Sequence, residues 1–144
     1  MNDSVSICLP IFNEEKSIKK VIEEWVSCLE DLSINYEIIC SEDGSTDKTP
    51  EIIKELCLNN SHIINNHSDT KRGYTGAVIS GVEKSNNDFI LCIDSDGQCD
   101  QQDFKKFWNN RNKLQNGFLV GNRFTRKDGT FRIIISKLFK ILHS

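Results

Sequence analysis

Residues 89–100 have the sequence Phe-Ile-Leu-Cys-Ile-Asp-Ser-Asp-Gly-Gln-Cys-Asp, an unbroken apolar run followed at once by acidic residues. An apolar run such as Phe89 to Ile93 is typical of a strand buried on both faces, as in a parallel sheet covered by helices. In such a sheet, ligands bind outside the carboxyl ends of the strands. This stretch therefore predicts an α/β fold and a functional site at Asp94 and Asp96.

Strand-like and helix-like segments alternate on both sides of this stretch. Before it, we expect strands at 5–9, 36–40 and 62–64, and helices at 18–32, 49–58 and 74–84. After it, we expect a helix that begins at Asp100 or Asp103, and a further strand at 118–120. This alternation predicts an open, mainly parallel, Rossmann-like α/β sheet with helices on both faces.

Length and composition indicate one globular domain. The chain has 144 residues, of which 38% are hydrophobic and 27% charged, enough for a single core. The six cysteines show no C-x-x-C spacing, so we expect reduced, mostly buried thiols rather than a zinc or redox site. No run approaches the ~20 apolar residues of a membrane span, and the first residues lack a signal-peptide pattern. We therefore expect a cytoplasmic protein body.

The acidic run Asp94-Ser95-Asp96 offers oxygen ligands of the kind that Mg²⁺ and Mn²⁺ prefer, directly after a rigid strand. Gly97 allows a tight turn, and the Gln98 carbonyl could join the metal shell. A cation held here would stabilise a departing nucleoside diphosphate as a Lewis acid. The simpler interpretation is that Asp-Ser-Asp-Gly is only a turn, because these residues dominate turns.

Two other functions for the same residues can be weighed. An EF-hand loop that starts at Asp94 would need Gly and Glu where Cys99 and Lys105 stand, so that function is excluded. An aspartyl-phosphate phosphatase also places Asp-x-Asp after a buried strand, with the first carboxylate as nucleophile. It would need further acidic and basic motifs well downstream, and fewer than fifty residues follow Asp96.

Two further acidic clusters follow predicted strands. Asn13, Glu14 and Glu15 follow the first, where the acids could instead favour a first helical turn. Glu42, Asp43 and Asp47 follow the second, where Asp43 could accept hydrogen bonds from a base or a ribose. Asp47 is a candidate helix cap. The segment 71–73 precedes a helix, where a cation and the helix dipole could attract a diphosphate.

Taken together, these positions resemble the family-2 inverting glycosyltransferases of GT-A fold. The segment 10–15 looks like their first-strand motif, 42–47 like their second-strand motif, and 94–96 like their metal-binding DxD. The resemblance implies a sugar transferase with a divalent cation, Mg²⁺ or Mn²⁺, and Asp94 and Asp96 as catalytic residues. It places metal ligands at Asp94, Asp96 and Gln98. It places nucleotide-sugar contacts at Pro10, Phe12, Asn13, Glu14, Asp43, Ser45, Arg72, Gly73, Asp94 and Ser95.

Within that family, the polyprenyl-phosphate sugar transferases, of the dolichyl-phosphate mannosyltransferase kind, are the most similar. Gln98 follows the DxD as in that group, and 121–123 resembles its Gly-Ser-Arg, with Asn122 as a departure. The resemblance implies a UDP- or GDP-linked sugar donor and a polyprenyl phosphate acceptor held by Arg123, Arg132 and Ser136. A phosphate acceptor is already anionic, so it needs cations to place it more than it needs a general base.

The resemblance predicts a nucleotide-sugar-binding domain over 1–125, followed by a basic amphipathic tail over 126–144. The tail could lie on the cytoplasmic face of a membrane, or pack against a second copy of the chain. No nucleic-acid partner is expected. Because family members continue beyond this length, the alternative is a truncated nucleotide-sugar-binding or regulatory protein without transferase activity.

Overall fold

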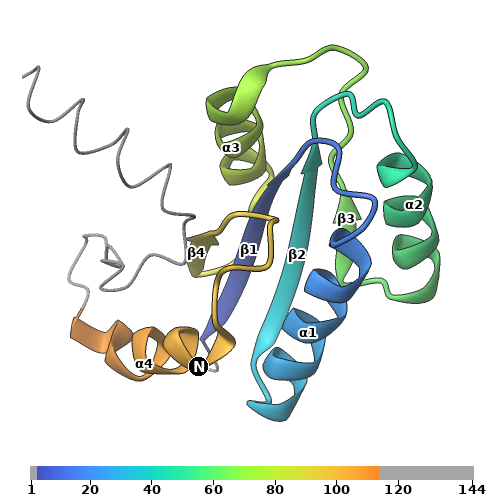
Figure 1. Ribbon diagram of the computed structural model, residues 1–144. Coiled ribbons are helices and arrows are strands. Elements are labelled where there is room, and N and C mark those ends of the chain that lie inside the picture. The colour runs from blue at the N-terminus through green and yellow to red at the C-terminus, as the bar shows by residue number, and fades with distance from the viewer. Residues whose placement is uncertain (1–2, 114–144) are drawn as a thin grey trace, which may run out of the picture. The chain divides into compact units, whose positions relative to one another are not determined.

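The computed structural model describes residues 3–113, in which strands and helices alternate regularly (Figure 1). The helices are α1 (Ile18–Asp31), α2 (Thr49–Asn59), α3 (Gly73–Lys84) and α4 (Gln101–Asn110), followed by a 3-10 turn at Arg111–Lys113. The strands are β1 (Ser4–Ile11), β2 (Asn35–Glu42), β3 (Ile63–Asn65) and β4 (Phe89–Cys92). Within the described residues, the predicted elements are confirmed, with bounds that differ by no more than two residues.

The described strands form a parallel sheet in the order β3-β2-β1-β4. β1 pairs with β2 over its whole length, and Ile11 lies opposite Glu42 at the end of the pair. On its other side β1 pairs with β4, where Cys8 lies opposite Cys92. The strand order changes direction at β1, and parallel α/β sheets bind ligands at such a point. The fold therefore places its binding crevice at the carboxyl ends of β1, β2 and β4.

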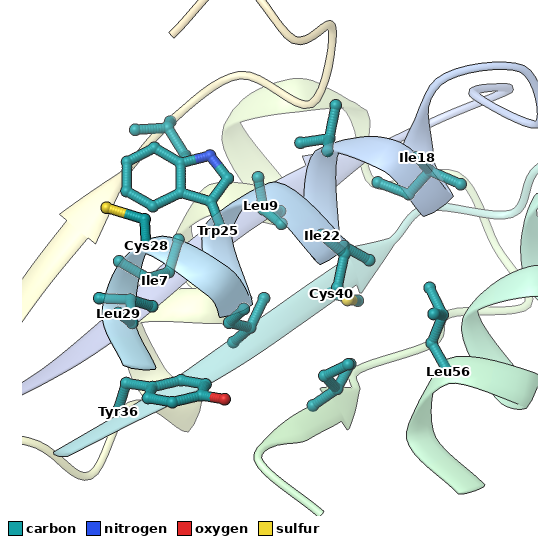
Figure 2. Close-up of a cluster of buried hydrophobic side chains, with 14 of the residues drawn as sticks. Ile7, Leu9, Ile18, Ile22, Trp25, Cys28, Leu29, Tyr36, Cys40 and Leu56 are labelled. Carbon is teal, nitrogen blue, oxygen red and sulfur yellow. The ribbon is translucent and has the colours of Figure 1, made fainter. Parts of the chain in front are cut away.

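One face of the sheet carries the hydrophobic core (Figure 2). Alternate residues of β1 point into it, and α1 faces them with buried side chains at helical spacing. α4 adds Phe104, whose ring meets Trp25 edge-on with 5.5 Å between ring centroids. The largest buried side chains of this core are Ile7, Leu9, Ile11, Ile18, Ile22, Trp25, Leu29, Ile38 and Ile53.

Helix α3 packs on the opposite face, against β1 and β2. Its buried residues are Ala77 and Gly81. A Cβ atom at Gly81 would lie 2.7 Å from the Ser41 hydroxyl and 3.3 Å from the Cys8 Cβ atom. The absent side chain therefore lets the helix approach the sheet closely.

The prediction that Phe89 to Ile93 is buried on both faces is wrong. β4 is an edge strand among the described strands, and its residues alternate between partly buried and exposed. Ile90 is 46% exposed, whereas Phe89 and Leu91 pack against the core. The strand buried along nearly its whole length is β1, which has β2 and β4 on its two sides.

The first compact unit of the chain ends at Trp108, and the site described below belongs to it. The predicted boundary between 1–125 and 126–144 lies outside the described residues, as do the predicted strand 118–120 and the amphipathic tail. In residues 3–113, no helix combines the length and the apolarity needed to cross a membrane.

Candidate functional site

A cavity of about 350 Å³ opens where the carboxyl ends of β1, β2 and β4 meet. Its volume is in the range of small-molecule sites in proteins. The cavity brings Asp43, Asp94 and Asp96 together, although they are far apart in the sequence. Its lining residues are Pro10 and Ile11 at the end of β1, Phe12 and Glu14 after it, Asp43 after β2, Lys71 before α3, Tyr74 and Ala77 in α3, and Asp94, Ser95 and Asp96 after β4.

The segment after β4 is a tight turn anchored to β1. The buried Ser95 hydroxyl donates to the Pro10 carbonyl at 2.9 Å, and Asp96 Oδ1 accepts the Gln98 backbone N–H at 2.9 Å. Gly97 has φ +75°, a conformation that glycine adopts without strain. The turn interpretation and the ligand-site interpretation therefore describe the same residues: the turn presents Asp94 and Asp96 to the cavity.

Tyr74 connects the start of α3 to this turn. Its phenol hydroxyl donates to Asp94 Oδ1 at 2.8 Å, although the side chain is 64% exposed. The hydrogen bond to the Asp94 carboxylate, reinforced by burial, raises the pKa of Tyr74 to about 12. The phenol is therefore protonated at neutral pH and acts as the hydrogen-bond donor. Sequence reasoning did not single out Tyr74.

Asp43 holds the first turn of α3. It is almost completely buried, and its two carboxylate oxygens accept the backbone N–H groups of Arg72 at 2.7 Å and Gly73 at 2.9 Å. The N–H groups at the start of a helix have no acceptor within the helix. Here the Asp43 carboxylate, which follows β2, accepts hydrogen bonds from two of them. Asp43 thus has a structural role besides the nucleotide contact expected of it.

Arg72 and Lys71 have different surroundings. The Arg72 guanidinium donates to the Ser80 hydroxyl at 2.7 Å, to the Glu42 carbonyl at 3.3 Å and to Asp43 Oδ1 at 3.4 Å, and it does not line the cavity. Lys71 does line the cavity, with its ammonium 3.6 Å from the centre of the Phe12 ring. Lys71 is therefore the cation that the described residues present to a ligand, and the signal for it was its place before a helix.

The loops after β1 and β2 are joined by a set of hydrogen bonds that we call the loop latch, formed by residues 13–15 and 45–49. Each loop uses backbone N–H groups as donors and side chains of the other as acceptors. In the latch, the side chains of Asn13, Ser45 and Glu15 each accept a hydrogen bond from the opposite loop, which is a structural role that needs no ligand. Its bonds are Asn13 N–H to Ser45 Oγ, Glu14 N–H to Thr49 Oγ1, Glu15 N–H to Asp47 Oδ2, Thr46 N–H to Asn13 Oδ1, and Lys48 N–H to Glu15 Oε2.

Glu42, the last residue of β2, is a fully buried carboxylate that contacts Ser45 of the latch. One of its oxygens contacts His67 Nδ1, and the other accepts the Ser45 backbone N–H at 2.5 Å. His67 Nε2 lies 3.0 Å from Asp69 Oδ1. The hydrogen bonds with Glu42 and then Asp69 raise the pKa of His67, so its imidazolium form offsets the buried charge of Glu42.

Comparison with known proteins assigns this chain to a family. The profile of glycosyl transferase family 2 matches residues 6–143, nearly the whole chain. The chain belongs to glycosyl transferase family 2. This chain is 30% identical over 140 residues to the undecaprenyl-phosphate 4-deoxy-4-formamido-L-arabinose transferase of Photorhabdus laumondii. The match covers 96% of this chain and 42% of the relative. The enzyme of the same name from Salmonella choleraesuis is 30% identical over 141 residues, with the same coverage.

The same fold occurs in solved structures. TarS of S. aureus, residues 1–349, superposes with a TM-score of 0.63 at 19% identity, covering 83% of the family-2 chain and 38% of TarS. The structure of TarS 1–349 in complex with UDP-GlcNAc gives a TM-score of 0.63 at 17% identity, covering 85% and 38%. Similarity at this identity establishes the GT-A fold. The chain spans about two fifths of the length of the curated relatives it matches.

The charges of the family-2 cavity suit a cation. Among the described residues, the lining has the carboxylates of Glu14, Asp43, Asp94 and Asp96 and the ammonium of Lys71, and the Arg72 guanidinium outside the lining lies 3.4 Å from Asp43 Oδ1. A nucleoside diphosphate is itself anionic, so a cation beside it would offset the carboxylate charge of this cavity. In residues 3–113, no three His, Cys, Asp or Glu side chains converge as a complete metal site. The donor set fits Mg²⁺ or Mn²⁺ instead, because these ions can be held by one or two carboxylates together with substrate phosphates.

The residues predicted from the sequence fall into three groups in the family-2 site. One group lines the cavity: Pro10, Phe12, Glu14, Asp43, Asp94, Ser95 and Asp96. A second group supports the lining without being part of it: Asn13, Ser45, Arg72, Gly73 and Gln98. The third group, Arg123, Arg132 and Ser136, lies outside the described residues.

Proposed function

We propose that this chain supplies the donor-binding part of a glycosyltransferase that moves a sugar from a nucleoside-diphosphate sugar to a polyprenyl phosphate, with inversion at the anomeric carbon. One observation carries the proposal: Asp43, Asp94 and Asp96 line a single cavity at the strand ends of a family-2 domain. The alternative predicted from sequence, a binding protein without transferase activity, is an outcome of the test below.

Different lining residues would contact different parts of the nucleoside-diphosphate sugar. Phe12, Glu14 and Asp43 lie at the ends of β1 and β2 and would contact the nucleoside. Asp94 and Asp96 would hold Mg²⁺ or Mn²⁺, which when bound supplies positive charge that stabilises the departing nucleoside diphosphate. Lys71 adds a protein cation at the same cavity. Catalysis then depends mainly on orientation and charge stabilisation of the donor.

The acceptor is inferred from the relatives and from the chain's basic residues. Two relatives are named as undecaprenyl-phosphate sugar transferases. In this chain, Arg123, Arg132 and Ser136 are proposed to bind the lipid phosphate, whose oxygen attacks the anomeric carbon without prior deprotonation by a protein base. A lipid acceptor would place the protein at the cytoplasmic membrane surface during the reaction.

Calorimetric titration with UDP and with GDP, each with and without Mn²⁺, tests the donor site. We expect binding of one nucleotide that strengthens at least tenfold with Mn²⁺, because the ion offsets carboxylate charge in the cavity. Asp96→Ala should abolish the Mn²⁺ effect. Asp103→Ala removes an exposed carboxylate on α4, outside the cavity, and should bind like wild type. Wild-type behaviour of Asp96→Ala would contradict the proposed cation site.

Transfer itself needs a separate measurement. The protein is incubated with UDP- and GDP-sugars and undecaprenyl phosphate in membrane vesicles, and glycosylated lipid is detected by mass spectrometry. We expect a product that requires a divalent cation and disappears in Asp94→Asn. Nucleotide binding with no product under any donor would favour the binding-only alternative.

A further inference from the structure

Tyr74 is placed between the two acidic parts of the cavity. It is the second residue of α3, and its hydroxyl donates across the cavity rim to Asp94, twenty residues away in the sequence. The ring is largely exposed and is not part of the hydrophobic core. An exposed hydrogen bond of this kind contributes little to the free energy of unfolding, because water competes for both partners. We therefore look for a role of the Tyr74–Asp94 hydrogen bond other than stabilising the fold.

The position of Tyr74 is fixed from the opposite side by Asp43. The Asp43 carboxylate accepts the backbone N–H groups of Arg72 and Gly73, the two residues immediately before Tyr74. Gly73 has φ +77°, which directs the chain into the helix at this point. A continuous connection therefore runs from the carboxylate after β2, through the first turn of α3, to the carboxylate after β4. Tyr74 is the last member of this connection before Asp94.

We propose that Tyr74 is a positioning residue that orients the Asp94 carboxylate toward the divalent cation. The inference rests on the proposed function, in which Asp94 is a cation ligand. A carboxylate has about four acceptor positions on its two oxygens, so a phenol hydrogen bond and a metal bond are compatible. The phenol carries no charge, so it restrains the carboxylate without neutralising it as a lysine would. Hydrogen-bond partners of metal ligands act in this way, and their loss typically weakens metal binding about 10–100-fold.

The phenol could also compete with the cation for Asp94, and that role predicts the opposite change in metal affinity. If the phenol only occupied Asp94 in place of the cation, the ion would have to displace it, and removal of the hydroxyl would strengthen metal binding. The direction of the change in Mn²⁺ affinity therefore separates the two roles.

The test compares Tyr74→Phe with Tyr36→Phe. Each variant loses one phenol hydroxyl, but Tyr36 donates to Glu30 at 3.2 Å and does not line the cavity. Mn²⁺ affinity is measured by electron paramagnetic resonance at saturating UDP or GDP, whichever the wild type binds. We expect Tyr74→Phe to bind Mn²⁺ about 10–100-fold more weakly, and Tyr36→Phe to match wild type. Equal or tighter binding by Tyr74→Phe overturns the inference.

Two further measurements separate positioning from general damage to the fold. The melting temperature of Tyr74→Phe should remain at the wild-type value, because the lost hydrogen bond is made by a largely exposed side chain. In an Asp94→Asn background, adding Tyr74→Phe should cause no further loss of Mn²⁺ affinity, since the two residues act through one contact. Additive losses in the double variant contradict the inference.

Failure of the inference can be told apart from failure of the proposed function. If the wild-type protein binds no Mn²⁺ with either nucleotide, the cation site itself is wrong and both conclusions fall. If the wild type binds Mn²⁺ and Tyr74→Phe binds it equally well, the proposed function stands and only the role of Tyr74 is lost.

Discussion

Asp43 Oδ2 accepts the backbone N–H of Gly73 at 2.9 Å, so a carboxylate at the end of β2 holds the beginning of α3. The partner oxygen accepts the Arg72 N–H at 2.7 Å. We expect Asp43→Ala to lower the free energy of unfolding by about 2 kcal/mol, because both donors lose their acceptor. Urea unfolding measures this. Asp43→Asn keeps one acceptor oxygen and should lose about half as much, whereas Asp103→Ala should change stability by less than about 0.5 kcal/mol.

The pairing of His67 with Glu42 predicts a pH dependence of stability. The hydrogen bonds with Glu42 and Asp69 raise the pKa of His67 above its value in the unfolded chain. The stabilisation is therefore complete below the unfolded pKa, about 6.5, and is lost as pH rises through the folded pKa. The difference in unfolding free energy between wild type and His67→Gln should be larger at acidic than at alkaline pH. A difference that grows with pH would contradict the raised pKa.

The thiol of Cys92 should react faster than the buried cysteines. It is exposed on β4 opposite Cys8, and the hydrogen bond with the Cys8 thiol lowers the pKa of Cys92 to about 7. Burial raises the pKa of Cys40 and of Cys57. We expect iodoacetamide to modify Cys92 first near pH 7, as followed by peptide mass spectrometry. In Cys8→Ala the pH midpoint of this reaction should move up toward the ordinary thiol value of about 8.5.

Trp25 should be the most sensitive single position of the core. Its side chain is almost completely buried and meets Phe104 edge-on. Trp25→Ala should destabilise the fold by about 3–5 kcal/mol through lost burial and a residual cavity. Leu58→Ala truncates a side chain that is 81% exposed on α2 and should cost less than about 0.5 kcal/mol. Chemical denaturation of the two variants in parallel provides the comparison.

The element order could be predicted because apolar spacing and turn residues are local signals. The apolar repeat of α1 and the position of Pro50 at the start of α2 follow from the sequence alone. The partial exposure of β4 could not be predicted, because an apolar run does not reveal where its strand lies in the sheet, and among the described strands β4 lies at an edge. That information depends on the order of strands in the sheet, which is set by long-range packing.

The cavity was predictable in outline and not in detail. Strand ends in a parallel sheet meet at one rim, which is why Asp43, Asp94 and Asp96 could be grouped before their positions were known. Which neighbouring basic residue lines the cavity depends on the conformation of the loop before α3, where the Arg72 guanidinium donates to Ser80 and Lys71 lines the cavity. Tyr74 gave no motif signal, since its importance arises only from its contact with Asp94.

The loop latch has a consequence for how a ligand is received. Residues 13–15 and 45–49 fix one another's backbone through bonds made within the protein. The conformational entropy of these loops is therefore lost during folding and need not be lost again on association. A preorganised loop pair leaves more of the contact free energy to appear as affinity. A donor that binds on this side of the cavity should then cause little change in the backbone conformation of these two loops.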